Sequence, residues 1–331
     1  MAERFLYTSS LSFSLAIAYL FVIKFGNKLN IGKKFSLKFI FSNNKTISFA
    51  MIIILVLYSF KTVSRNSYWK DNLTLLKEDI KTCPNSCRIL FSYGGTLLFI
   101  KALKEKDQLK KDLLLDEVIS KLEKGNTILQ TFSDSYLHLG LAYTEKKNYT
   151  KAAENFDAAK RSKIWEEPDF FVSAGVAYHL AGQCEKAVVE FKKALELDSK
   201  KSEAYGNWGL CLLESNKIKE AIEKLNIATQ LSPEYATAWY NIGNAYARLN
   251  LFNEAINYYK NSLLIDPNYI DVLVNAGNCY GALQNPHEAI SYYEKVLSLD
   301  PQNINALTNI STSYKLLGEE KKAAEYTNSL K

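Results

Sequence analysis

A small residue recurs through the C-terminal two-thirds of this 331-residue chain at almost constant spacing, with successive steps of 35, 34, 34, 34 and 34 residues. The small positions are Gly140, Gly175, Gly209, Gly243, Gly277 and Ser311. A second set of small residues follows twelve residues later and consists of Ala152, Ala187, Ala221, Ala255, Ala289 and Ala323. Self-similarity at a fixed period of this length is typical of stacked repeat units and not of a single globular core.

The rest of the period resembles the tetratricopeptide-repeat (TPR) family. Bulky residues stand four positions before each small residue: Tyr136, Phe171, Tyr205, Trp239, Leu273 and Leu307. Aromatic residues recur later in the unit, and prolines close three units: Phe156, Phe191, Tyr259 and Tyr293, then Pro233, Pro267 and Pro301. The resemblance implies two antiparallel helices per unit. Gly and Ala would lie where the helices cross, aromatics would fill the space between one unit and the next, and proline would end the second helix.

We therefore expect an all-α fold in which two transmembrane helices precede a TPR right-handed α-solenoid. Six units are expected in residues 133–331, starting near 133, 168, 202, 236, 270 and 304. Residues 66–132 are expected to form a linker and a degenerate first repeat, with Gly94 in the small position and an insertion around ALKEKDQLKKD.

Residues 1–65 are predicted to be a membrane region, because two apolar stretches lie at about 5–25 and 46–62. A helix needs about 20 residues to cross a bilayer core of about 30 Å. The second stretch is short, so Lys45 and Lys61 are expected to reach toward the head groups.

The loop at residues 26–45 is expected to be cytoplasmic, because lysines in and beside it are accompanied by no acidic residue. The lysines are Lys24, Lys28, Lys33, Lys34, Lys38 and Lys45. The repeat domain would then lie on the opposite, extracytoplasmic side, in a periplasm or in the lumen of the endoplasmic reticulum.

The distribution of charge argues against nucleic acid as a partner. Residues 1–132 carry 20 Lys and Arg against 10 Asp and Glu, whereas residues 133–331 carry 21 against 25. The repeats therefore lack the concentrated basic surface that neutralises phosphates.

Neither a metal nor a cofactor is predicted. His138, His179 and His287 are far apart in the sequence, so we expect them on helix surfaces. Cys83 and Cys87 are close enough to form a disulfide in an oxidising compartment, and two free thiols are the alternative.

The residues most suited to binding a partner are asparagines in the first helix of successive units, the helix that lines the concave face in TPR solenoids. The position two residues before the small residue holds His138, Ser173, Asn207, Asn241, Asn275 and Asn309. A carboxamide has an acceptor and donors, so a row of four asparagines could pair with the backbone of an extended peptide. Asn244 and Asn278 could widen the row, and Tyr240 is a candidate side-chain contact.

A structural role is the alternative for these asparagines, which could bond the neighbouring unit and fix the stacking. Tyr240 could likewise be a packing residue. We identify no catalytic constellation, phosphate-binding loop or HExxH motif, so the chain alone is not expected to be an enzyme.

A second resemblance covers essentially the whole chain. The segment AERFLYTSSLSF, the second apolar stretch and SRNSYWKDNLTLLKEDIKTCPNSCR, followed by repeats, resemble the C-terminal part of transmembrane and TPR-containing protein O-mannosyltransferases of the GT-C class and their bacterial relatives. That family takes sugar from a lipid-phosphate donor and presents the acceptor on an extracytoplasmic TPR domain. Arg4 matches a family position that faces the donor phosphate.

The family's catalytic acidic residues lie in an early loop, whereas Glu3 is the only acidic residue before Asp71 in this sequence. The resemblance thus implies a missing N-terminal membrane half. Two functions remain: a membrane-anchored scaffold that binds peptides or proteins, and the acceptor-binding fragment of an O-mannosyltransferase.

Overall fold

The computed structural model describes Ile53 and residues 71–162 and 164–329. Apart from Ile53, the two predicted membrane helices and the lysine-rich loop lie outside the described residues. Among the described residues, no helix has the length and apolar character needed to span a membrane. The fold divides into two compact units, Met1–Leu75 and Leu76–Lys331, and the repeats lie in the second.

The described residues contain fifteen α-helices and one 3-10 helix, and no strand occurs among them. The helices before the six predicted units are α4 (Asn72–Thr82), α5 (Cys87–Ile100), η1 (Ala102–Lys104) and α6 (Gln108–Ile128). The helices that follow are α7 (Ser133–Glu145), α8 (Tyr149–Ser162), α9 (Pro168–Leu180), α10 (Cys184–Leu197), α11 (Ser202–Glu214), α12 (Ile218–Leu231), α13 (Ala236–Arg248), α14 (Phe252–Ile265), α15 (Ile270–Ala282), α16 (Pro286–Leu299), α17 (Ile304–Leu316) and α18 (Glu320–Asn328).

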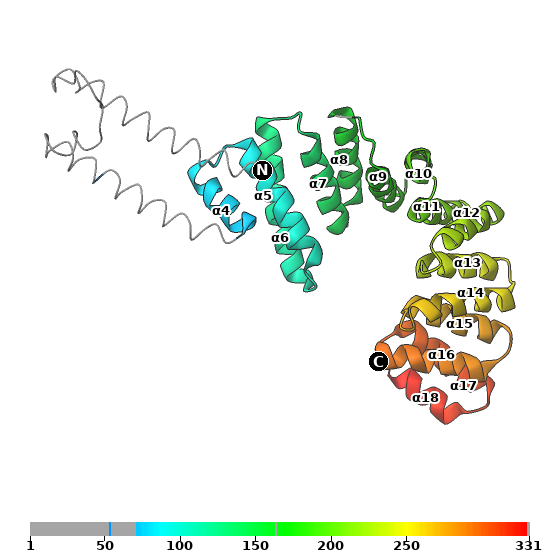
Figure 1. Ribbon diagram of the computed structural model, residues 1–331. Helices are drawn as coiled ribbons and strands as arrows, with labels where there is room; N and C mark the ends of the chain where they lie inside the picture. The colour runs from blue at the N-terminus through cyan, green and yellow to red at the C-terminus, as the bar shows by residue number, and fades with distance from the viewer. Residues whose placement is uncertain (1–52, 54–70, 163, 330–331) are drawn as a thin grey trace, which may run out of the picture. The chain divides into compact units, whose positions relative to one another are not determined.

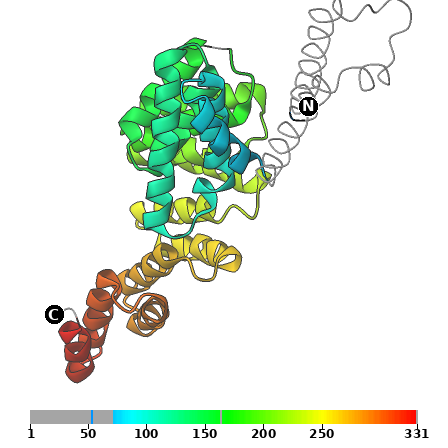
Figure 2. The same cartoon turned by 90° about the vertical axis from the view of Figure 1, so that its left-hand side faces the viewer.

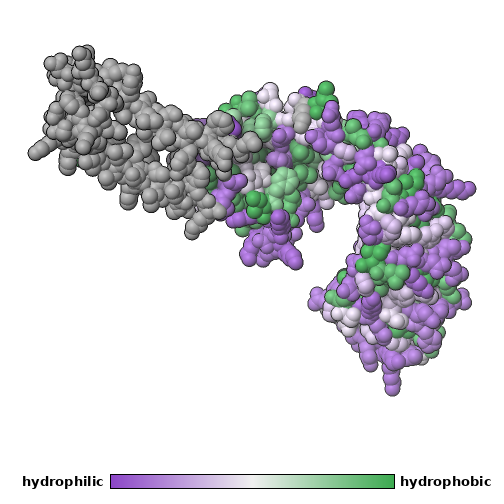
Figure 3. All heavy atoms as spheres, in the orientation of Figure 1, coloured by the Kyte–Doolittle hydropathy of each residue, from purple (hydrophilic) through white to green (hydrophobic). Residues whose placement is uncertain are grey.

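From α5 to α18 the helices form consecutive pairs that follow one another along a curved row (Figures 1 and 2). Within a pair the two helices pack together, and the second helix of each pair packs on the first helix of the next. We call the contact between successive pairs a seam. The all-α solenoid expected from the period is confirmed, and polar residues cover much of its surface (Figure 3).

In the first five units the glycine at the small position lies against a large side chain sixteen residues later in the same unit. A Cβ added to Gly277 would lie 2.6 Å from Cε1 of Tyr293, and one added to Gly209 would lie 2.6 Å from Cγ of Leu225. The expectation that the aromatics fill the space between units was therefore incomplete, because each ring first covers the glycine of its own unit. Phe156 does both, since its ring also packs edge-on against Phe170 of the next unit at 5.8 Å.

The last unit replaces this contact with hydrogen bonds. Ser311 occupies the small position and Thr327 the position sixteen residues later, and their hydroxyl oxygens are 2.9 Å apart. The Ser311 hydroxyl also donates to the backbone carbonyl of Ala323 at 2.9 Å. The buried hydroxyl is thereby satisfied, which allows serine to stand where the other five units have glycine.

In the turn between the two helices of each unit, the residue seven positions after the small residue has a left-handed backbone conformation. The six residues are Lys147, Gly182, Asn216, Asn250, Gln284 and Gly318, with φ between 54° and 75°. Only two are glycine, so the turn is imposed by the packing of the helix pair and not by glycine alone.

Two glycines of α15 provide a matched test of this packing. Gly277→Ala is expected to lower the free energy of unfolding by about 1–3 kcal/mol, because the new methyl group meets Tyr293. Gly281→Ala is expected to raise it by about 0.5–1 kcal/mol, because no atom lies within 4 Å and alanine is the better helix former. Urea unfolding of both variants measures the difference, and equal effects would contradict the close contact.

Candidate functional site

The predicted binding residues all lie on the first helices of successive units. Asn207 is in α11, Asn241, Tyr240 and Asn244 are in α13, Asn275 and Asn278 are in α15, and Asn309 is in α17. These four helices belong to consecutive pairs, so the residues follow one another across three seams.

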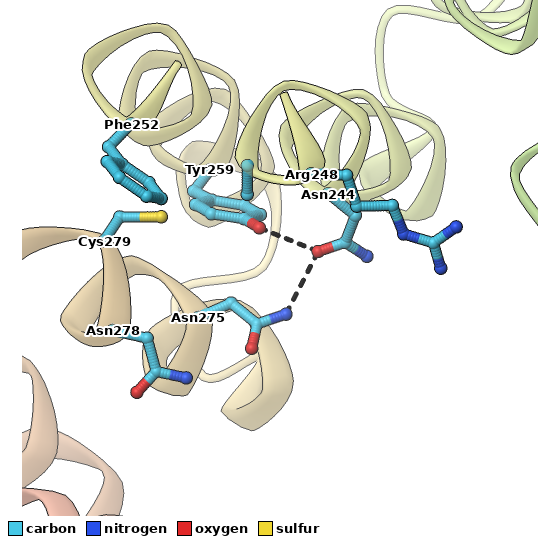
Figure 4. Close-up of a pocket in the computed structure, with 8 residues that line it drawn as sticks. Asn244, Arg248, Phe252, Tyr259, Asn275, Asn278 and Cys279 are labelled. Atoms are coloured by element: carbon cyan, nitrogen blue, oxygen red, sulfur yellow. Dashed lines mark hydrogen bonds between the residues drawn. The ribbon is translucent and has the colours of Figure 1, made fainter. Parts of the chain in front are cut away.

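The seam between α13 and α15 joins two of the predicted asparagines through a shared carbonyl oxygen. Oδ1 of Asn244 accepts a hydrogen bond from the Tyr259 hydroxyl at 2.7 Å and a second one from Nδ2 of Asn275 at 3.0 Å. Figure 4 shows both bonds meeting at the Asn244 side chain. Nδ2 of Asn275 also lies 3.2 Å from the hydroxyl oxygen of Tyr240.

The next seam repeats this arrangement 34 residues later. Oδ1 of Asn278 accepts from the Tyr293 hydroxyl at 2.8 Å and from Nδ2 of Asn309 at 2.8 Å. We call each set of tyrosine and two asparagines an amide relay. Both relays pin one unit to the next, which is the stacking role that the sequence left open as an alternative.

The tyrosine hydroxyls that orient the relays stay protonated at neutral pH. Burial raises the pKa of Tyr259 far above its ordinary value. Burial also raises the pKa of Tyr293, to about 12, although a hydrogen bond with Asn309 opposes the shift. A protonated hydroxyl is a donor, so the relay carbonyl must accept and the side-chain amides of Asn244 and Asn278 keep a fixed orientation.

The other two predicted asparagines have different surroundings. Asn241 is only 6% exposed, whereas Asn207 is partly exposed and its amide donates to the backbone carbonyl of Glu203 at 2.8 Å. Tyr240 is partly exposed, and its ring lies 5.3 Å from Tyr269 and 6.1 Å from Tyr259. The structure thus brings the asparagines together in pairs and not as four equivalent side chains.

A pocket of about 470 Å³ lies beside the first relay (Figure 4). Its lining consists of Asn244, Ala247, Arg248, Phe252, Tyr259, Asn275, Asn278 and Cys279. Three of the predicted residues are therefore found at one hollow, with apolar surface from Phe252 and polar groups from the relay. Such a mixture of apolar wall and oriented polar groups is typical of ligand pockets.

Arg248 is the charged residue of the lining, and the sequence did not indicate it as a binding residue. It ends α13, it is exposed, and one guanidinium nitrogen donates to the carbonyl of Leu213 in the preceding unit. The guanidinium group has five N–H donors, so donors remain for a ligand. A comparison of the six residues at this position of the repeat could have identified Arg248, because none of the other five is basic. They are Glu145, Leu180, Glu214, Ala282 and Leu316.

The histidines do not all lie on helix surfaces as expected. His138 has its Nδ1 buried, and burial lowers its pKa. The His179 side chain is 8% exposed and stands with Cys184 and Cys211, their ligating atoms all within 4.8 Å of one another. His287 is exposed as predicted. The expectation was wrong for His179 because sequence distance hides a contact that the seam creates.

The five cysteines are all free, including Cys83 and Cys87, whose redox state the sequence left open. Cys83 is exposed and Cys87 is partly buried. Cys211 and Cys279 are buried within the repeats.

Three segments match family descriptions of the same repeat. Residues 133–163 and 234–302 match tetratricopeptide repeats, and residues 209–250 match a TPR repeat. Together with the helix pairs and the period, these matches show that the chain carries tetratricopeptide repeats and that its repeat region is a TPR solenoid.

A curated relative is the human protein named Protein O-mannosyl-transferase TMTC3. It is 23% identical over 261 residues, which cover 68% of this chain but 27% of that protein. This chain therefore spans about a quarter of the length of the relative. Residues 133–331 alone are too few to make up the 68% of this chain that is matched. The similarity therefore extends before residue 133.

Solved structures share the fold. A structure of PilF from Pseudomonas aeruginosa has a TM-score of 0.53 and 24% identity, covering 60% of this chain and 90% of that one. The Cut9–Hcn1 hetero-tetramer structure has a TM-score of 0.56 and 18% identity, covering 75% of this chain and 47% of that one. At these identities the likeness concerns the fold alone.

Proposed function

We propose that this chain is a membrane-anchored, extracytoplasmic TPR scaffold that holds an extended peptide segment of a partner protein against its amide relays. The observation that carries the proposal is the repetition of the same relay at two consecutive seams, the first of them beside a pocket that Arg248 also lines.

The relays leave matched polar groups for a ligand. Within the described part of the chain, no hydrogen bond involves Nδ2 of Asn244 or Asn278, or Oδ1 of Asn275 or Asn309. Each pair therefore keeps one set of donors and one acceptor, which is what a peptide group requires from its partner. The stacking role and the binding role are compatible, because different atoms of the same amides serve each.

Pre-orientation favours binding. A free side chain that becomes fixed on binding costs about 0.5–1.5 kcal/mol. The relay amides are already held by the tyrosine hydroxyls and by one another, so that cost is reduced for them. Partner proteins would thus be recognised by backbone pattern, with the pocket between α13 and α15 receiving a side chain.

The anchoring part of the proposal is supported by the sequence. The apolar stretches at about 5–25 and 46–62 and the lysines between them favour two spans with a cytoplasmic loop at 26–45, and thus a lipid bilayer as a second partner. The repeats would then face the extracytoplasmic side. Protease protection of a tag after Lys331 in sealed vesicles tests this orientation.

Removal of the asparagines is expected to weaken peptide binding by at least about 10-fold, since each lost hydrogen bond contributes about 0.5–1.5 kcal/mol. The variant replaces the four relay asparagines, Asn244, Asn275, Asn278 and Asn309, with alanine. The probes are extended 12-residue peptides selected on the wild-type chain from a random phage-displayed library, and fluorescence anisotropy measures their affinity.

The matched control replaces Asn253 and Asn257, two exposed asparagines on the second helix α14, with alanine. It should bind the selected peptides as the wild type does. Circular dichroism checks that the quadruple variant keeps its helix content. Selection of no peptide by the wild type, or equal affinity in both variants, would contradict the proposal.

The similarity to Protein O-mannosyl-transferase TMTC3 favours a second candidate, the acceptor-binding portion of a lipid-phosphate-sugar-dependent protein O-mannosyltransferase. The match covers more of this chain than the six units of 133–331, so it also reaches the helices that precede them. In that case the held peptide would be the acceptor, and the catalytic acidic residues would come from an N-terminal membrane half.

Translation of the DNA upstream of Met1 separates the two candidates. Apolar spans with a pair of acidic residues in an early loop would support the transferase. An intergenic gap would support the free-standing scaffold, for which we expect no transferase activity.

A further inference from the structure

Four side chains with metal-binding atoms meet at the seam between the unit of α9 and α10 and the unit that begins with α11. His179 comes from the end of α9, Cys184 begins α10, and Cys211 and Glu214 lie on the last turn of α11. We propose that this cluster binds one zinc ion and ties the two units together.

The geometry is close to that of a tetrahedral site. The ligating atoms of His179, Cys184 and Cys211 lie within 4.8 Å of one another. Zinc–sulfur bonds of about 2.3 Å and zinc–nitrogen bonds of about 2.0 Å place tetrahedral ligand atoms roughly 3.5 Å apart. Side-chain rotations that move these atoms by about 1 Å would therefore close the site.

Glu214 supplies the fourth ligand. Its Oε1 is 2.8 Å from Nε2 of His179, and its Oε2 is 3.2 Å from Sγ of Cys184. One carboxylate oxygen lies beside the imidazole and the other beside the Cys184 thiol, so a rotation of the carboxylate would bring an oxygen to the ion. The set of two thiols, an imidazole and a carboxylate matches the ligands of zinc, whereas calcium and magnesium prefer oxygen alone.

The repeat itself shows that the cluster is unusual. His179 and Cys184 stand four and nine residues after the small residue of their unit. Cys211 stands two residues after the small residue of the next unit. The corresponding triplets at the following two seams are Leu213, Ile218 and Ala245, then Ala247, Phe252 and Cys279. Each of those triplets belongs to a single hydrophobic cluster. Apolar packing is thus sufficient at a TPR seam, and three coordinating residues at one seam call for another explanation.

A disulfide between Cys184 and Cys211 explains less of the cluster. It would use the two thiols alone, whereas His179, whose side chain is 8% exposed, and Glu214 also contact each other at the same place. Zinc uses all four groups. Cys211 is 1% exposed, whereas the Glu214 side chain is 47% exposed, so the cluster is closed on one side and open to an entering ion on the other.

Cobalt titration tests the site, because Co²⁺ takes the place of zinc and absorbs light. The full chain is purified in detergent with reductant, freed of metal with a chelator and titrated with CoCl₂. We expect one Co²⁺ per chain with thiolate-to-cobalt charge-transfer absorption and the d–d bands of a tetrahedral centre, all abolished by ZnCl₂. Cys184→Ala with Cys211→Ala is expected to weaken zinc binding at least 100-fold, and Glu214→Gln to weaken it about 10-fold.

The control is Cys279→Ala, which changes a buried cysteine at the same offset as Cys211 and should leave cobalt binding intact. Alanine stands at this offset in three other units, as Ala142, Ala177 and Ala245, so Cys211→Ala should still fold. Equal circular dichroism spectra would verify this. Absence of the thiolate band in the wild type, or its persistence in the double variant, would overturn the proposal. So would a Cys184–Cys211 disulfide, with no zinc bound, in protein that was never exposed to a chelator.

Discussion

Replacing Lys160 with methionine is expected to lower the free energy of unfolding by about 3 kcal/mol, because the change removes the nearest and most buried counter-ion of a buried carboxylate. Lys160 Nζ in α8 lies 2.9 Å from Oε1 of Glu190 in α10 and 3.0 Å from Oδ1 of Asp157. The Glu190 side chain is 5% exposed, and its Oε2 has no hydrogen-bond partner among the described residues. Urea unfolding measures the loss.

The double variant Lys160→Met with Glu190→Met separates pairing from packing. Once both charges are absent, apolar contacts replace the ion pair, and stability is expected to return to within about 1 kcal/mol of the wild type. Lys193 compensates only in part for Lys160, since its Nζ is 3.6 Å from Oε1 of Glu190 and its side chain is 43% exposed. A single variant as stable as the wild type would show that the pair contributes little.

The wild type and Lys160→Met are expected to differ in how much stability they lose in acid. In the wild type, burial would raise the pKa of Asp157, but hydrogen bonds from Tyr178 and Lys160 outweigh it and hold this pKa below 3.8. Its contribution is present above that ordinary value and is lost as the pH falls through the folded-state pKa. In Lys160→Met the hydrogen bond and ion pair from Lys160 to Asp157 are absent, so this contribution should be smaller and the loss of stability in acid less steep.

The helix pairs could be predicted from the sequence, because a close crossing admits only small residues and therefore leaves a fixed period. The structure has α7, α9, α11, α13, α15 and α17 begin at residues 133, 168, 202, 236, 270 and 304. The partner of each glycine was harder to predict. The spacing of sixteen residues indicates that Phe191 lies on the second helix of its unit. From there its ring could contact either the glycine of its own unit or the next unit, and the sequence does not decide between them.

The site was predictable only in part, for a related reason. Asn244 and Asn275 are 31 residues apart, and only the angle between successive units brings their amides within 3.0 Å. The sequence could therefore place both on first helices without showing that they bond each other. His179, Cys184 and Cys211 stand at three different positions of the repeat, so they form no local sequence motif. They become recognisable only when the same positions are compared at the following two seams, where the residues are apolar or include a single cysteine.

Phe191→Ala is expected to lower the free energy of unfolding by about 3–5 kcal/mol, because it empties a fully buried position at the centre of a unit. Phe191 is 0% exposed and its ring covers Gly175. The comparison is Phe99→Ala at the end of α5, where the ring is 45% exposed and the expected loss is below about 1 kcal/mol. Thermal and urea unfolding of both variants measure these changes.

Coupling between Gly175 and Phe191 tests whether this contact sets the period. A Cβ added to Gly175 would lie 2.7 Å from Cδ1 of Phe191, so Gly175→Ala alone should cost about 1–3 kcal/mol. Phe191→Ala removes every ring atom that the methyl group would meet and so leaves room for it. The double variant should then be more stable than the sum of the two single changes predicts, by at least about 1 kcal/mol. Strict additivity would mean that the ring and the glycine do not constrain each other, and the recurrence of small residues every 34 positions would need another cause.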